Sequence, residues 1–267
     1  MIVINILLCG HNRTATWRQV KTGELCRAFC APVSIYFLDN KSGEVYCNGL
    51  LESRVSSDDV NSYFEFSSYS FLLELISSRV TESDAILLCN DTIFDHHISS
   101  LWLKVIDYYL ARLTAGVILG DARSDAGYSY LSSWVYLFRA GDLSSFLSSL
   151  QEAIICAKSV EQNYEVDCAD EYAKHLEPFV KQKLMSWLFS DKLLRGWEKS
   201  TRTFESMPGH ERYRKGISIY IEHELSKQLK AAGFALADFK SEKFLGKVCN
   251  VIDRAGSLFR KVCRRLL

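Results

Sequence analysis

The chain has 267 residues, of which 48% are hydrophobic and 12% are aromatic. That length and apolar content support a sizeable core and argue against a wholly disordered chain. The 32 Lys and Arg residues balance the 32 Asp and Glu residues, so the overall charge does not indicate a nucleic-acid partner. Nine cysteines without a Cys-x-x-Cys pair indicate reduced thiols in a cytosolic protein, not a disulfide framework.

The first half of the chain alternates strand-like and helix-like segments. Apolar runs predict strands at residues 2–9, 33–38, 84–90, 116–120 and 134–139. Helical spacing of apolar residues predicts helices near residues 16–28, 69–79, 101–114 and 143–157. This alternation indicates an α/β fold with crossover helices and a mixed, mainly parallel sheet.

We expect one domain over residues 1–237, with the sheet in residues 1–150 and a mainly helical part in residues 151–237. Residues 238–267 differ, because eight Lys and Arg stand against three Asp and Glu, a net charge of 8 − 3 = +5. Apolar residues recur there at helical spacing, which predicts a basic amphipathic helix. Such a helix suits an anionic membrane surface; the alternative is a helix docked on the protein with a solvated basic face.

The positive charge of this helix is highest at its end, at Arg260, Lys261, Arg264 and Arg265. The first apolar run, residues 1–9, is too short to span a bilayer and lacks the basic start of a signal peptide. We therefore expect a cytoplasmic protein that is held peripherally on the inner face of the membrane.

Polar side chains follow three of the predicted strands. They are His11, Asn12 and Arg13 after the first strand, Asp39 after the second, and Asn90, Asp91 and Thr92 after the strand at 84–90. Ligands of open α/β sheets bind at the carboxyl ends of strands, so a shared edge would make a cleft. The alternatives are an ordinary turn at Asp39 and a helix cap at residues 90–92.

Several common nucleotide and hydrolase motifs are missing from the sequence. There is no G-x-G-x-x-G, no P-loop and no G-x-S-x-G, which argues against Rossmann dinucleotide binding, Walker-type sites and a hydrolase elbow. Gly10 stands alone after the first strand, so the glycine-rich loop expected of a methyltransferase is missing as well.

Four segments, taken in order, resemble a known family. They are Tyr63–Tyr69, Asp84–Phe94, Gly116–Gly120 and Tyr130–Phe138. Together they resemble the rhamnan-synthesis F-type and related O-antigen and capsule glycosyltransferases, over roughly residues 60–150. The resemblance implies a GT-A-type fold, a single α/β domain that binds a nucleotide-sugar. It also implies that the strand ending in residues 90–92 takes the place of the metal-binding Asp-x-Asp strand.

This chain departs from the Asp-x-Asp pattern because Asn-Asp-Thr offers a single carboxylate, Asp91. One alternative is that Asp91, the donor diphosphate and waters hold Mg²⁺ or Mn²⁺. The other is that a basic side chain neutralises the diphosphate, for which Arg13, Arg18 and His97 are the candidates.

A further segment, residues 221–234, resembles the helix of family-2-type GT-A enzymes that begins with an acidic catalytic base. Glu222 or Glu224 would then be the base, and Glu65 is another candidate. The alternative is a plain amphipathic surface helix.

The resemblance implies a hexosyl- or deoxyhexosyltransferase of bacterial O-antigen or capsule synthesis. It would move a sugar from a nucleotide-sugar to a lipid-linked glycan, with no nucleic-acid partner. His11, Asn12, Arg13 and Asp39 would hold the nucleotide, with Asn90, Thr92 and His97 nearby. The alternative is a non-catalytic glycan-binding or scaffold subunit that assembles with other polysaccharide-assembly enzymes.

Overall fold

The computed structural model describes residues 2–63, 65–95, 99–125, 128–162 and 209–241. The strands are β1 (Ile4–Gly10), β2 (Val33–Asp39), β3 (Glu44–Cys47), β4 (Leu50–Arg54), β5 (Ala85–Asn90), β6 (Val117–Asp125), β7 (Tyr128–Arg139) and β8 (Ala235–Asp238). Within the described ranges they form one eight-stranded sheet in the order β4-β3-β2-β1-β5-β7-β6-β8.

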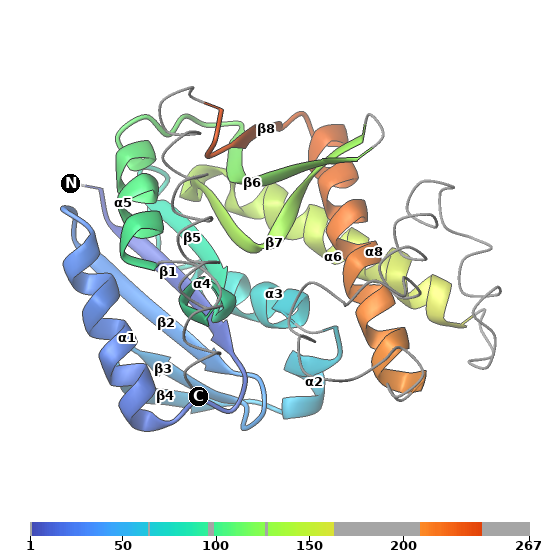
Figure 1. The fold of residues 1–267 in the computed structure, drawn as a ribbon, viewed down its shortest axis with the longest axis horizontal. Coiled ribbons are helices and arrows are strands. Elements are labelled where there is room, and N and C mark those ends of the chain that lie inside the picture. Colours follow the sequence, from blue (N-terminus) through green and yellow to red (C-terminus); the bar gives the residue numbers. More distant parts are fainter. Residues whose placement is uncertain (1, 64, 96–98, 126–127, 163–208, 242–267) are drawn as a thin grey trace, which may run out of the picture.

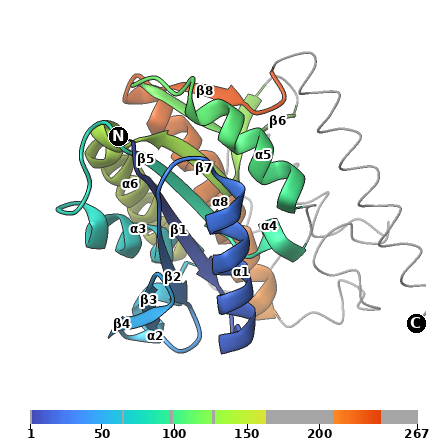
Figure 2. The ribbon, with the colours of Figure 1, turned by 90° about the vertical axis from the view of Figure 1, so that its left-hand side faces the viewer.

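Helices cover both faces of this sheet. They are α1 (Ala15–Ala28), α2 (Ser57–Asn61), α3 (Glu65–Ile76), α4 (Thr92–Asp95), α5 (Ser99–Leu110), α6 (Leu143–Gln162) and α8 (Gly209–Ala231), with a 3₁₀ turn, η1, at Ala140–Asp142. Figures 1 and 2 show α1, α4 and α5 on one face, and α3, α6 and α8 on the other. The α/β expectation is confirmed at the level of this three-layer arrangement.

Each face of the sheet has its own apolar core. On one side, Leu25 of α1 and Trp102 of α5 pack against outward residues of the central strands. On the other, Phe66 of α3, Phe146 of α6 and Leu225 of α8 do the same. Every residue of β1 is buried. A strand covered on both faces is expected to be mostly apolar, and Asn5, which is itself only 4% exposed, is the polar exception in this strand.

The sheet is less parallel than the sequence indicates. Its parallel pairs are β1–β2, β1–β5 and β6–β8, whereas β2–β3, β3–β4, β5–β7 and β6–β7 are antiparallel. The expectation of a mainly parallel sheet is therefore wrong. The sequence reading missed the β3–β4 hairpin, although its turn residues Asn48 and Gly49 have φ values of 48° and 87°. Asn-Gly between two strands is a strong signal for such a hairpin.

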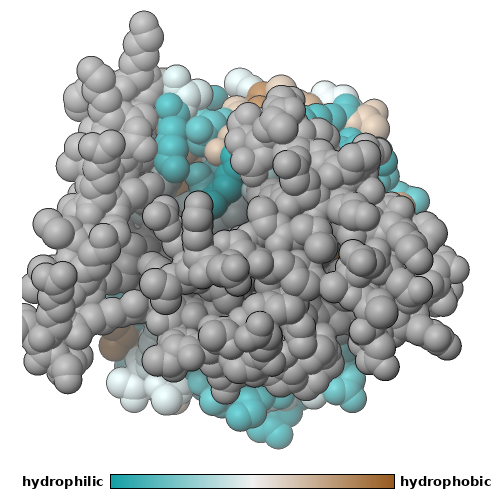
Figure 3. All heavy atoms as spheres, turned by 45° about the vertical axis from the view of Figure 1, so that its right-hand side comes forward, coloured by the Kyte–Doolittle hydropathy of each residue, from teal (hydrophilic) through white to brown (hydrophobic). Residues whose placement is uncertain are grey.

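Residues 238–241, the start of the expected C-terminal helix, belong to the sheet unit instead. Asp238 ends β8, Phe239 is fully buried, and Lys240 donates to Asp121 Oδ1 at 3.0 Å. The rest of that expected helix, with Arg260, Lys261, Arg264 and Arg265, lies outside the described residues. In the described part of the chain, no helix combines the length and the apolar character needed to cross a bilayer. The described surface visible in Figure 3 is mainly hydrophilic, with scattered apolar spots.

Candidate functional site

The carboxyl ends of β2, β1 and β5 meet at one edge of the sheet, as expected from the sequence. These strands are parallel neighbours, with Gly10 beside Asp39 and Cys9 beside Asn90. The polar residues that follow them therefore converge, and hydrogen bonds join the loop after β1 to both neighbouring strand ends.

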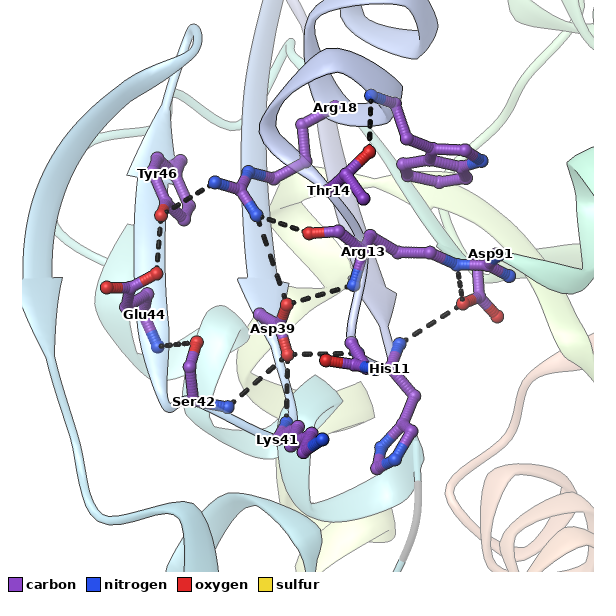
Figure 4. Close-up of polar contacts among 12 residues, drawn as sticks. His11, Arg13, Thr14, Arg18, Asp39, Lys41, Ser42, Glu44, Tyr46 and Asp91 are labelled. Carbon is purple, nitrogen blue, oxygen red and sulfur yellow. Dashed lines mark hydrogen bonds and ion pairs between the residues drawn. The ribbon is translucent and has the colours of Figure 1, made fainter.

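Asp91, which follows β5, binds the loop after β1 through a single carboxylate oxygen. Its Oδ2 accepts the His11 backbone N–H at 3.1 Å and the Arg13 Nε–H at 2.7 Å (Figure 4). Gly10 permits this approach, because a Cβ on it would lie 3.1 Å from Asp91 Oδ2 and 3.0 Å from the Phe37 ring. The strand end thus presents a carboxylate that is already paired with a cation.

The Arg13 guanidinium is fixed on two sides. It pairs with Asp91, and it lies 4.7 Å from the centre of the Trp17 ring of α1. The side chains of Arg13 and Asp91 remain 23% and 18% exposed. A partly exposed arginine at the carboxyl edge of a sheet is well suited to bind a phosphate group, because its donors match phosphate oxygens in pairs.

Asp39 has a different use in this structure. Its buried carboxylate accepts the backbone N–H groups of Asn12, Arg13, Lys41 and Ser42 at 2.9–3.3 Å. These bonds close the turn after β2 and fix the loop after β1, where Asn12 has φ 56°. The ordinary turn expected as the alternative at Asp39 is therefore present, and the Asp39 oxygens accept backbone donors, with Oδ2 lying 4.0 Å from the Arg18 guanidinium.

A second network borders this loop on the β3 side. Arg18 donates to the Arg13 carbonyl at 2.6 Å and to the Tyr46 hydroxyl at 2.9 Å, while Tyr46 donates to Glu44 at 2.5 Å (Figure 4). The Tyr46 hydrogen bond lowers the pKa of Glu44. The sequence reading missed Tyr46 and Glu44, because it did not predict the hairpin that carries them.

Two of the predicted catalytic carboxylates meet at Ser133 of β7. The Ser133 hydroxyl donates to Glu65 Oε1 at 2.6 Å, and its backbone N–H donates to Glu222 Oε1 at 2.5 Å. Glu65 begins α3, and Glu222 lies on α8. The Ser133 carbonyl accepts the Tyr69 hydroxyl at 2.9 Å. Tyr69 and Ser133 lie in the segments that carry the family resemblance, but their roles were not predicted.

Glu65 and Asp91 both act on one buried thiol, that of Cys9. Burial is the largest cause that raises the pKa of Cys9, and the charges of Glu65 and then Asp91 raise it further. Both carboxylates are therefore close to the end of β1. Three acidic residues from separate parts of the sequence, Glu65, Asp91 and Glu222, thus gather at this edge of the sheet.

The side chains of the other predicted residues have different surroundings. Glu224 turns toward its own helix, where it accepts from Gln228 at 2.7 Å and Lys227 at 3.4 Å. The side chains of His11 and Asn12 are exposed, and Asn90 is half-buried. Thr92 begins α4, which fits the helix-cap position weighed for residues 90–92. His97 lies outside the described residues.

A protein-built metal site is not supported by the donor set at Asp91. Among the described residues, no group of three or more His, Cys, Asp or Glu side chains is placed to hold a metal ion. The oxygen of Asp91 that faces the loop already binds a guanidinium and an N–H. A divalent cation prefers several oxygen ligands, so the residues present fit Arg13 as the local cation better than Mg²⁺ or Mn²⁺.

A separate cleft of about 400 Å³ lies on the outer side of α3. It is lined by side chains of α2, α3 and α6, including Tyr63, Phe71 and Lys158. None of the predicted site residues lines it. The convergence of polar groups, not the presence of a cavity, therefore identifies the candidate site.

Comparison of the chain with protein-family models, with curated proteins and with solved structures gave no match.

Proposed function

We propose that the protein is a glycosyltransferase that moves a sugar from a nucleotide-sugar donor to a lipid-linked glycan of a bacterial surface polysaccharide. One observation carries the proposal: the Asp91–Arg13 pair stands at the carboxyl edge of the sheet, beside the Glu65–Ser133–Glu222 cluster. A cation for a departing diphosphate and carboxylates for an acceptor hydroxyl are the two groups that the reaction needs.

The donor would bind over the loop after β1. Its nucleotide would lie near His11 and Asn12, and its diphosphate would bind the Arg13 guanidinium. Asp91 would orient Arg13 and the donor sugar. Arg18, which is hydrogen-bonded to the Arg13 carbonyl, would keep this loop in place.

The acceptor hydroxyl would lose its proton to Glu65 or Glu222 as its oxygen bonds to the anomeric carbon. The bond from that carbon to the donor phosphate breaks, and its electron pair leaves with the nucleoside diphosphate. Arg13 stabilises the negative charge that develops on this leaving group.

Nucleotide binding is the first test of this function. A ligand that binds only the native state must raise its stability, so UDP, GDP or dTDP is expected to raise the Tm. Arg13→Ala should abolish the shift, whereas the matched control Arg54→Ala should retain it, because Arg54 is an exposed arginine on the edge strand β4. Turnover is then measured as nucleoside diphosphate release from UDP-glucose, UDP-galactose, GDP-mannose and dTDP-rhamnose.

The lipid-linked acceptor is supported by the basic sequence of residues 242–267. We expect this segment to bind anionic lipid through charge and an apolar helix face. The matched truncation ends at Ser241, because Phe239 and Lys240 are part of the folded unit. The full chain should co-sediment with phosphatidylglycerol vesicles but not with phosphatidylcholine vesicles, and the truncated chain with neither. Equal binding of both chains would contradict the membrane role.

The second candidate function is a non-catalytic glycan-binding or scaffold subunit. Two observations favour it: the strand end has a single carboxylate, and Asp39 is committed to backbone donors. Absence of any Tm shift with all three nucleotides, together with a shift by a surface glycan, would support this function over catalysis.

A further inference from the structure

Ser133 stands at an interruption of the sheet. The ladder between β6 and β7 passes from Gly120–Tyr136 to Ala122–Leu131, so residues 132–135 of β7 stand opposite the single residue Asp121. On the other side, the ladder between β5 and β7 ends at the pair Cys89–Val135. Bulges of this kind redirect side chains and occur often beside active sites.

The backbone groups of Ser133 that leave the ladder are bound by side chains. Its N–H donates to Glu222 of α8, and its carbonyl accepts the hydroxyl of Tyr69 of α3. Buried backbone groups need such partners to avoid a desolvation penalty. The backbone of Ser133 is therefore held by two helices, α3 and α8, while the next residues, Trp134 and Val135, still contact the neighbouring strands.

The Ser133 hydroxyl adds a third contact, to Glu65 Oε1. Glu65 lies in the first turn of α3, where the positive end of the helix dipole stabilises a carboxylate in place. Glu222 lies in the interior of the 23-residue helix α8 and has no such support. The two carboxylates thus have different surroundings although they bind the same residue.

The hydroxyl of Tyr136 is a further buried polar group near Glu65 and Glu222. Tyr136 is fully buried, and among the described residues its hydroxyl has no hydrogen-bond partner. Burial raises its pKa most, and the charges of Glu222 and Glu65 raise it further, so both carboxylates lie near it. A buried hydroxyl normally binds a partner such as an ordered water, and an acceptor hydroxyl would meet the same requirement.

We propose that Ser133 and Glu65 are positioning residues, which hold Glu222 in place to deprotonate the acceptor hydroxyl. The inference rests on the proposed glycosyl transfer, in which either Glu65 or Glu222 could be the base. It assigns a separate role to each of these two carboxylates. Glu65 acts as an anchor for the Ser133 hydroxyl, and the Ser133 N–H orients the Glu222 carboxylate. Only Glu222 accepts the proton.

Isosteric substitutions separate the two roles. Glu65→Gln keeps an oxygen that accepts the Ser133 hydroxyl, so kcat should fall less than about fivefold, whereas Glu65→Ala should lower it about 10- to 100-fold. Glu222→Gln removes the base and should lower kcat at least about 100-fold. The opposite order, with Glu65→Gln inactive and Glu222→Gln active, would overturn the assignment.

Ser133 itself is tested by a pair of variants. Ser133→Ala should lower kcat about tenfold and leave the KM for the nucleotide-sugar unchanged, because the donor binds at the other cluster. Ser133→Thr keeps the hydroxyl and should restore most of the kcat. A change in KM alone, or equal loss in both variants, would contradict the positioning role. The assay uses whichever of the four named nucleotide-sugars the wild-type protein turns over.

A measurement without substrate distinguishes failure of this inference from failure of the proposed function. Urea unfolding midpoints are measured for Glu65→Ala, Glu222→Ala and the double variant. Because both residues bind Ser133, the two shifts should not add. The control pair Glu65→Ala with Glu224→Ala should be additive, since Glu224 bonds within α8. Additive shifts in the first pair would show that Ser133 does not couple Glu65 to Glu222 and would overturn this inference. A wild-type protein without nucleotide binding or turnover would overturn the proposed function.

Discussion

The two ends of β5 carry the same residue type in different settings. At the start of the strand, Asp84 accepts the backbone N–H groups of Val3 at 3.0 Å and Thr81 at 2.9 Å. At its end, Asp91 accepts one backbone N–H and the guanidinium of Arg13. Asp84 connects β5 to the residue just before β1, and Asp91 connects β5 to the residue just after β1. At Asp91 the connection also includes a charged side chain, that of Arg13.

The protonation behaviour of Asp84 matches a structural role. Burial by itself raises the pKa of its carboxyl, but the N–H groups of Thr81 and Val3 outweigh that effect, and the pKa is lowered. Two backbone donors stabilise the ionised form of this carboxylate and hold it in one position. The comparison teaches that the same residue type is bound by two backbone N–H groups at one end of β5 and by one N–H and a guanidinium at the other.

The largest effect is expected at Asp91, at the end of β5. Asp91→Ala should lower turnover on the order of 100-fold or more, because Arg13 and the donor lose their orienting carboxylate. The free energy of unfolding should change little, since the carboxylate is partly exposed. Diphosphate release and urea unfolding of the same variant check both statements. Near-normal turnover would remove Asp91 from the mechanism.

At Asp84, at the start of β5, a substitution should lower the free energy of unfolding and leave nucleotide binding unchanged. Asp84→Ala leaves two backbone N–H groups, those of Val3 and Thr81, without their acceptor and should cost about 2 kcal/mol of stability. The Tm shift produced by the nucleotide that binds should stay the same, because Asp84 lies at the opposite edge of the sheet. A lost nucleotide shift in a folded Asp84→Ala protein would contradict the division between the two ends.

A smaller effect is expected in the pH dependence of stability. The folded pKa of Asp84 lies below its ordinary value of 3.8, so its ionised form stabilises the fold above that pH. This contribution is lost as the pH falls through the folded value. As the pH falls from about 5 through 3.8 and below, the urea unfolding midpoint of Asp84→Asn should fall less steeply than that of the wild type. Parallel curves would show that Asp84 does not contribute to acid unfolding.

Sequence patterns predicted the central elements because those elements are the most buried. Strands β1 and β5 lie between two helical layers, so nearly every position is apolar, and the exceptions are Asn5 within β1 and Asn90 at the end of β5. The polar residues that follow them were predicted to meet, and their hydrogen bonds confirm it. Strand β4 was missed because its residues are mostly exposed, which leaves little periodicity to read.

The site was predicted only in part, for a physical reason. Glu65 and Glu222 were singled out separately, but they are 157 residues apart in the sequence (222 − 65). Their common partner, Ser133, lies in a segment that carries the family resemblance, but that segment does not mark it as the hydrogen-bond partner of both carboxylates. Glu224, two residues from Glu222, was an equal candidate until the rotation of α8 directed it toward Gln228.

The sequence by itself determined the α/β class, the central buried strands and the polar residues that end them, because burial and turn formation depend on local residue types. Tertiary structure decided what each polar residue does. Asp39 accepts backbone donors, and Asp91 accepts from Arg13. Glu65 and Glu222 both accept from Ser133 in the bulge of β7. These assignments depend on which strands become neighbours and how each helix is rotated, and such long-range packing leaves no mark on any single segment.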